Sequence, residues 1–253
     1  MSFESYVLTD IGCKRKENQD RVLCDHSLGL FVVADGMGGH QHGEIAAELA
    51  LTSIRYYVEA TQESLDATWP FGFDFDLSTD ANRLSTALQL ANQQVWSHAR
   101  QSDECKGMGT TMAALLLADA NVVVANVGDS RVYHFRDYLL AQLTYDDTLV
   151  NTLAQEPGAS AKEAANHPMR NVLTQAAGSS EAVDVHIVER PLQDGDLYLI
   201  CSDGLHGVIG DAAIRSILGA GDSLERTARH LDQAARANGA PDNLSVLLLA
   251  YSV

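Results

Sequence analysis

Basic residues are scarce in this sequence, which has 17 Lys and Arg against 34 Asp and Glu and a formal net charge of −17. Nucleic-acid phosphates are held by Lys and Arg, so this balance argues against a nucleic-acid partner. Long apolar runs are also missing, because none approaches the about 20 residues that a transmembrane helix needs. The first residues, MSFESYVLTD, contain no basic region followed by an apolar signal core. We therefore predict a cytoplasmic protein without a membrane partner.

Cysteine is sparse as well, and its spacing forms neither a CxxC pair nor a regular framework. We predict reduced thiols, while zinc or disulfide roles stay open. No GxxxxGK[ST] sequence is present, and GMGGH lacks the spacing of a dinucleotide fingerprint, so a P-loop nucleotide enzyme is not indicated. The hydrophobic fraction of 46% is nevertheless sufficient for a substantial core.

Two long segments have helical periodicity, at residues 44–60 and 82–101, and a loop at 61–80 separates them. Residues 110–143 contain short β-prone runs whose links are too short for crossover helices, which indicates antiparallel strands. Residues 144–170 are polar and irregular, with a short helix predicted from the capping box Ser160–Glu163. Further strands are predicted at 28–35, 171–178, 183–191, 196–203 and 243–253, and helices at 211–218 and 223–238.

Strands therefore group with strands, and helices come in pairs, which favours an α+β architecture over βαβ repetition. The sequence contains no internal repeat, low-complexity tract or linker. We predict a single domain over residues 1–253.

Aspartates recur at the ends of β-prone runs or beside glycine. Each alone is best explained as a turn residue, and the acidic composition could simply give a solvated surface. Strand ends can, however, gather distant carboxylates, which repel one another unless hard cations such as Mg²⁺ or Mn²⁺ neutralise them. The aspartates in this setting are Asp20, Asp35, Asp129, Asp203 and Asp242.

Seven short motifs follow one another along the chain: RKENQD (15–20), VVADGMGGHQHGE (32–44), GMGTT (107–111), NVGDSRVY (126–133), NVLTQAAG (171–178), LICSDGL (199–205) and PDNLSV (241–246). Together, and in this order, they resemble the metal-dependent protein phosphatases of the type 2C (PPM) family, bacterial branch. The resemblance implies a sandwich of two antiparallel β-sheets flanked by pairs of α-helices, in α-β-β-α layers, and one catalytic domain with a flap at about 144–170.

By this resemblance, two or three Mn²⁺ or Mg²⁺ ions are expected. Asp35 would bridge two of them, with the carbonyl oxygen of Gly36 as a further ligand. Asp203 and Asp242 would complete the first site. The glycine would let the main chain approach a cation closely.

Asp20 would serve the second ion, directly or through water, and Asp129 would help hold a third, weaker one. The implied reaction is hydrolysis of phosphoserine and phosphothreonine by in-line attack of a hydroxide that bridges two ions. Arg15 would grip the phosphate oxygens, and His40 would protonate the departing oxygen. Taken without the resemblance, Arg15 is a solvated charge and His40 a turn residue.

The sequence departs from the family pattern at Asp147, where many bacterial members have histidine. Gln175 and Ala177 stand where arginine and leucine are common, and the loop at 61–80 is expected to be a variable insertion. Two rival functions remain: a catalytically silent phosphatase-like domain that binds phosphopeptides or partners, and a hydrolase of small phosphoesters. The favoured prediction is a monomeric phosphatase of phosphorylated proteins that opposes a serine/threonine kinase.

Overall fold

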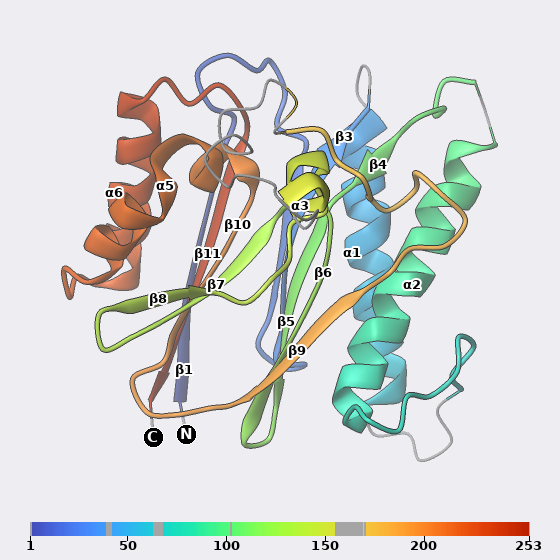
Figure 1. Ribbon diagram of the computed structural model, residues 1–253, viewed down its shortest axis with the longest axis horizontal. Helices are drawn as coiled ribbons and strands as arrows, with labels where there is room; N and C mark the ends of the chain where they lie inside the picture. The colour runs from blue at the N-terminus through green and yellow to red at the C-terminus, as the bar shows by residue number, and fades with distance from the viewer. Residues whose placement is uncertain are drawn as a thin grey trace.

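Two antiparallel β-sheets lie face to face between two layers of helices (Figure 1). The computed structural model describes residues 2–38, 42–62, 68–101, 103–154, 169 and 171–252. This architecture confirms the predicted α+β sandwich flanked by helix pairs. No helix in these ranges is long and apolar enough to cross a membrane.

The first sheet joins the two ends of the described chain, because its edge strand β1 pairs with β11 over the full length of both. All of its neighbouring strands are antiparallel. In spatial order the strands are β1 (Ser2–Asp10), β11 (Leu244–Ser252), β10 (Leu197–Cys201), β7 (Arg131–Arg136) and β8 (Leu139–Gln142).

The second sheet is antiparallel as well, and its strand β3 carries Asp35 directly opposite Asp20 of β2. The short strand β4 (Gly109–Thr110) pairs with the last part of β3. The remaining order is β2 (Asp20–Asp25), β3 (Leu30–Met37), β5 (Met112–Ala118), β6 (Asn121–Val127) and β9 (His186–Pro191).

The helices form one pair on each outer face of the sandwich. Two of them begin at a serine whose hydroxyl oxygen accepts a backbone N–H of the first turn: Ser78 from Ala81, and Ser223 from Arg226. The pairs are α1 (His42–Thr61) with α2 (Thr79–Ala99), and α5 (Asp203–Leu218) with α6 (Leu224–Ala237); a short α3 (Leu149–Ala154) lies apart from both.

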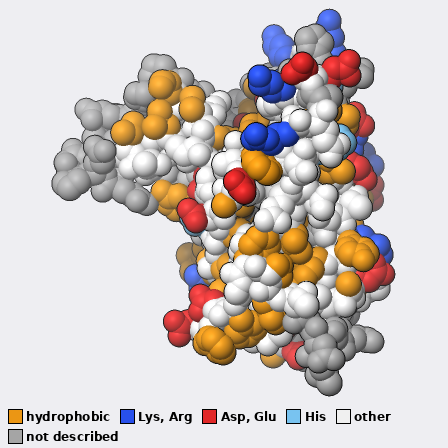
Figure 2. Space-filling view, turned by 90° about the vertical axis from the view of Figure 1, so that its right-hand side faces the viewer, with side chains coloured by type: hydrophobic (Ala, Val, Ile, Leu, Met, Phe, Trp, Pro, Cys, Tyr) orange, Lys and Arg blue, Asp and Glu red, His pale blue; other side chains and the backbone are white. Residues whose placement is uncertain are grey.

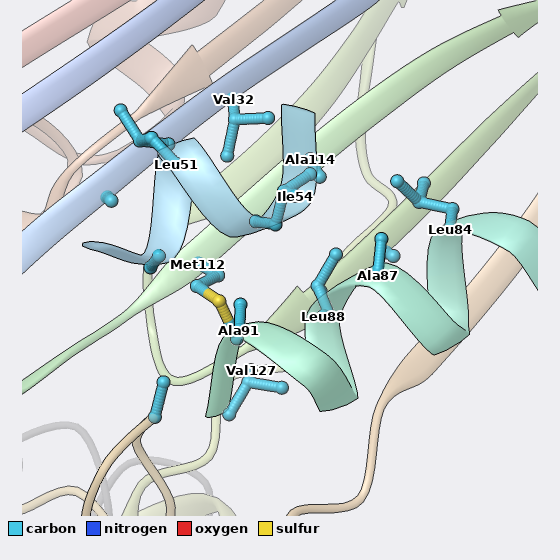
Figure 3. Close-up of a cluster of buried hydrophobic side chains, with 14 of the residues drawn as sticks. Val32, Leu51, Ile54, Leu84, Ala87, Leu88, Ala91, Met112, Ala114 and Val127 are labelled. Carbon is cyan, nitrogen blue, oxygen red and sulfur yellow. The ribbon is translucent and has the colours of Figure 1, made fainter. Parts of the chain in front are cut away.

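Three apolar layers hold these elements together: one between the two sheets, and one between each sheet and its pair of helices. Each sheet therefore carries apolar side chains on both of its faces. Val32 of β3 points toward the helices and belongs to the same apolar cluster as Ile54 and Leu88 (Figure 3), whereas the next residue, Val33, packs between the sheets. Burying one such side chain contributes about 1.5–3 kcal/mol. The sandwich therefore supplies a rigid frame for the loops at its ends.

Three sequence expectations need correction. Residues 171–178 do not form a strand; they make only two isolated bridges, Thr110 with Ala177 and Thr148 with Leu173. The helix predicted at 211–218 begins earlier, at Asp203, and bends at Gly210, where φ is 68°. Strand β1 was not predicted. The proposed capping box at 160–163 lies outside the described residues.

All four cysteines are free, as predicted: Cys13, Cys24, Cys105 and Cys201.

Candidate metal centre

The predicted aspartates come from both sheets and meet at one end of the sandwich, at the top of Figure 1. Asp20 begins β2 and lies opposite Asp35 near the end of β3. Asp203 is the first residue of α5, two residues after β10, and Asp242 stands two residues before β11. Asp129 lies in the turn that carries the chain from β6 in one sheet to β7 in the other.

A cavity of about 360 Å³ opens between these loops. Its walls include six of the predicted site residues, and Asp20 is buried beside it with an exposed fraction of 2%. Residues separated by more than 200 positions are thus brought to one cavity, as the sequence motifs predicted. The six are Arg15, Asp35, Gly36, Asp129, Asp203 and Asp242.

Burial and mutual repulsion raise the pKa values of four of the predicted carboxyl groups, those of Asp20, Asp35, Asp129 and Asp203. Burial raises the pKa of Asp20 to about 6 and that of Asp129 to about 7, and the charge of Asp203 adds to both shifts. The pKa values of Asp35 and Asp203 are raised for the same reasons, burial first and then neighbouring aspartates. Such a group favours either protons or cations over bare negative charge.

Two carboxylate oxygens at this end, Asp20 Oδ1 and Asp203 Oδ1, are buried and have no hydrogen-bond partner among the residues that the structure describes. Buried polar atoms are rarely left unpaired, and oxygen atoms of this kind are the ligands that Mg²⁺ and Mn²⁺ prefer. The residues present therefore fit divalent cations.

The side chains are not all turned toward one point, however. As they stand, no three His, Cys, Asp or Glu side chains within the described ranges could hold one ion. Asp20 Oδ2 accepts a hydrogen bond from Ser202 Oγ at 2.8 Å, and Asp242 Oδ2 accepts one from Arg15 Nη2 at 2.6 Å. The individual ligand roles therefore stay predictions.

Gly36 is required by backbone packing as well as by its predicted role. A Cβ at Gly36 would lie 2.1 Å from the carbonyl oxygen of Gly43 in the first turn of α1. The neighbouring Asp35 is held by its main chain: Thr110 Oγ1 and Thr111 N both donate to its carbonyl oxygen at 2.9 Å. These main-chain contacts hold Asp35 in position independently of any bound ion.

Arg15 lies in the cavity wall, but its guanidinium is bound to Asp242 rather than free for an anion. The hydrogen bond to Asp242 is also the main reason why the pKa of Arg15 is raised. Arg15 remains 53% exposed, so its fork can reach solvent as well. His40, the predicted proton donor, lies outside the described residues.

Sequence reasoning missed a buried network that supports the turn bearing Asp129. Asp146 accepts three hydrogen bonds from Arg131, at 2.6–3.1 Å. His206 Nε2 donates to the carbonyl oxygen of Asp129 at 2.9 Å, and burial lowers the pKa of His206 to about 3, which keeps its ring neutral. The signal for Asp146 was present as the acidic pair in LTYDDT.

Asp147, noted above as a departure from the family pattern, is hydrogen-bonded to the turn that bears Asp129. Its Oδ2 accepts the N–H of Gly128 at 2.8 Å, and its own N–H donates to the carbonyl oxygen of Gly128 at 3.0 Å. His186 Nε2 donates to its other oxygen at 2.8 Å. Asp147 therefore orients the residue before Asp129 and lies outside the cavity itself.

The other two departures also serve the local backbone. Gln175 exchanges two hydrogen bonds with the main chain of Asp184, at 2.7 and 3.2 Å. Ala177 exchanges two with Thr110, at 2.9 and 3.0 Å, and its side chain is fully buried. Ala177 thus ties this segment to β4, and Gln175 ties it to the residues just before β9.

Fold and site together define a two-sheet hydrolase-like sandwich with an acidic, cation-compatible cavity at one end. The family described as protein phosphatase 2C matches residues 14–248, so the chain belongs to this family, as the resemblance predicted.

Individual relatives agree along almost the whole chain. A putative protein phosphatase 2C-type from Streptococcus pyogenes is 36% identical over 246 residues, which are 95% of this chain and 94% of that protein. The crystal structure of the Mycobacterium tuberculosis serine/threonine phosphatase PstP/Ppp is 32% identical, with a TM-score of 0.85 and 99% coverage of both chains. The catalytic domain of PstP in complex with two manganese ions has a TM-score of 0.82, 29% identity and the same coverage.

Proposed function

We propose that this protein hydrolyses phosphoserine and phosphothreonine in proteins with the help of Mn²⁺ or Mg²⁺. The observation that carries the proposal is the convergence of aspartates from both sheets on one cavity, with buried carboxylate oxygens that lack partners. A solved relative holds two manganese ions, and the residues of this chain suit the same kind of ion.

The ions would be held by Asp35 and the Gly36 carbonyl together with Asp203 and Asp242, with Asp20 beside them. Asp129 is the candidate for a third ion. Divalent cations, when bound, neutralise the carboxylates and lower the pKa of water, which supplies a nucleophile near neutral pH. The list of proposed ligands is Asp20, Asp35, Gly36, Asp129, Asp203 and Asp242.

Arg15 would orient the phosphate through its planar fork. This role requires the guanidinium to exchange Asp242 for phosphate oxygens, and its exposure leaves room for that exchange. Neutralisation of Asp242 would weaken the pair and favour the exchange. His40 is retained as the proposed proton donor to the departing serine or threonine oxygen.

The assignment extends to the cellular setting. The protein would act in the cytoplasm as a monomer and a single domain, and would oppose a serine/threonine kinase on phosphorylated protein substrates. The full set of aspartates disfavours the silent binding domain, because that function needs no cation site. A preference for small phosphoesters is the second candidate function.

Phosphate release from a phosphothreonine peptide tests the proposal, with Mn²⁺, Mg²⁺ or EDTA present. We expect turnover that requires metal and is abolished by Asp203→Ala, while Asp137→Ala, at a side chain that is 88% exposed, serves as the matched control. Binding of the phosphopeptide by a folded protein without turnover in any metal would favour the silent domain. Faster turnover of small phosphoesters than of peptides would favour the second candidate.

A further inference from the structure

A second cleft of about 890 Å³ lies next to the acidic cavity. It runs between the C-terminal end of α2 and the turn of residues 103–108. Met37, at the end of β3, lines both spaces, so an extended chain that enters the cavity can continue into the cleft. We refer to this space as the α2 cleft.

The charge of the α2 cleft is opposite to that of the acidic cavity. Arg100 and Lys106 line it against a single acid, Asp103. Both basic residues are exposed, and neither forms an ion pair with a carboxylate in the part of the chain that the structure describes. In a protein with twice as many acids as bases, these two residues give the α2 cleft a basic lining beside the acidic cavity. Figure 2 shows Lys and Arg side chains gathered at the upper end of this face.

The floor of the α2 cleft is apolar and partly aromatic. Met108 is 1% exposed, and the half-buried Trp96 lies under the guanidinium of Arg100, whose carbon is 4.8 Å from the ring centroid. Stacking on an aromatic ring holds Arg100 in place while leaving its N–H groups available. The combination suits a polypeptide, whose side chains can pack on the floor while its acidic groups meet the two cations.

We propose that the α2 cleft binds the segment of the phosphoprotein substrate that flanks the phosphorylated residue, and that it selects acidic flanks. The inference rests on the proposed function, since it concerns the same substrate. Arg100 and Lys106 would attract the acidic side chains of such a flank. Charge of this kind mainly sets which partner is accepted and how fast it binds.

The experiment compares three substrates. The first is a phosphothreonine peptide with Asp and Glu on both sides; the second has Asn and Gln in their places; the third is a small aryl phosphate without flanks. The test variant is Arg100→Glu/Lys106→Glu. Its matched control is Arg215→Glu/Arg226→Glu on α5 and α6, which changes the net charge equally at exposed positions of the opposite helical layer.

We expect the test variant to raise KM for the acidic peptide about tenfold, from the loss of two attractions and the gain of two repulsions. Its kcat, and both constants for the neutral peptide and the aryl phosphate, should stay within about twofold of wild type. The effect should shrink as salt is added. Equal changes for both peptides, or the same change in the control, would overturn the proposal.

Failure of the proposed function is distinguishable, because wild type would then turn over neither peptide. In that case, binding of a peptide, rather than turnover, tests the proposed role of the α2 cleft. The sequence has two tryptophans, so Trp69→Phe leaves Trp96 as the only reporter. A non-hydrolysable phosphonate version of the acidic peptide should change Trp96 fluorescence, and Arg100→Glu/Lys106→Glu should weaken that binding about tenfold. No fluorescence change, or unchanged affinity in the variant, would contradict the inference.

Discussion

Strand β10 has an aspartate near each of its ends, and the two have opposite surroundings. Asp196, just before the strand, accepts hydrogen bonds from His134 Nε2 at 2.7 Å and from Arg136 Nη1 at 2.9 Å. Asp203, two residues after the strand, has a buried oxygen without a partner and other aspartates for neighbours.

The pKa values follow this difference in partners. Burial alone would raise the pKa of Asp196, but the hydrogen bonds from His134 and the main chain of Gln193 lower it overall. Burial also raises the pKa of Asp203, and there the charge of Asp242 adds to the rise. One end of the sandwich therefore uses a carboxylate to stabilise the fold, while the other end keeps carboxylates available for cations.

Replacing Asp203 by asparagine should produce the largest effect. Asp203→Asn preserves shape but removes a charge, so we expect phosphatase activity to fall by about a thousandfold or more. Its free energy of unfolding in EDTA should be unchanged or higher, because one repulsive charge is gone. Phosphate-release kinetics and urea unfolding measure the two quantities. Activity close to wild type would remove Asp203 from the metal site.

Replacing Asp196, at the other end of β10, should lower stability rather than activity. Asp196→Ala leaves His134 and Arg136 without their buried partner, so we expect a loss of about 3–4 kcal/mol in the free energy of unfolding. The activity of the folded protein should be kept. Asp137→Asn is the control, at an exposed acid near Arg136 whose left-handed backbone, with φ of 51°, asparagine tolerates; it should change stability by less than about 0.5 kcal/mol. If Asp196→Ala lost as much activity as Asp203→Asn, the proposed difference between the two ends of β10 would be wrong.

Acid should stabilise the protein when a chelator keeps cations away. The folded-state pKa values of Asp20 (about 6) and Asp129 (about 7) exceed the unfolded value, so the folded state binds more protons as pH falls. The free energy of unfolding in EDTA should therefore rise by about 2–3 kcal/mol from pH 8 to pH 5.5. Saturating Mn²⁺ should abolish this slope, and Asp20→Asn should make it shallower. A fall in stability over this range would contradict the stated origin of the raised pKa values.

A smaller effect is expected at Asp147. Both of its carboxylate oxygens accept hydrogen bonds, as those of Asp196 do. His186→Ala removes one donor to Asp147 and should cost about 1–2 kcal/mol in urea unfolding. Because Gly128 still donates to Asp147, activity at saturating Mn²⁺ should change less than about threefold. His26→Ala, which removes an exposed contact with Ser5, is the control. A large loss of activity would mean that His186 acts in the site itself.

The two ends of β10 also mark the limit of what the sequence predicts. Asp196 and Asp203 both stand beside a glycine at an end of the same β-prone run. What differs is β7, whose His134 and Arg136 bind Asp196 although they lie 62 and 60 positions away from it along the chain. Its place at the end of the run made Asp203 one of five candidate aspartates, and the resemblance to a family gave it the role of a metal ligand.

Helical periodicity located α1 and α2 well, because each buries one continuous stripe. Strand β1 was missed because it is an edge strand with few fully buried side chains, and its pairing depends on β11. Residues 171–178 are β-prone but are held by scattered bridges and by Gln175. Such tertiary contacts are not encoded in local propensity.

The pairing of β1 with β11 also bears on the order of events during protein synthesis. Among the described strands β1 is synthesised first and its partner β11, spanning Leu244–Ser252, last, directly after Asp242. Until then β1 has an unpaired edge along its whole length, a surface that invites association with other nascent chains. The proposed cation site also gains its last carboxylate only at this stage. Neither the complete first sheet nor the proposed active site can therefore form before β11 has been synthesised.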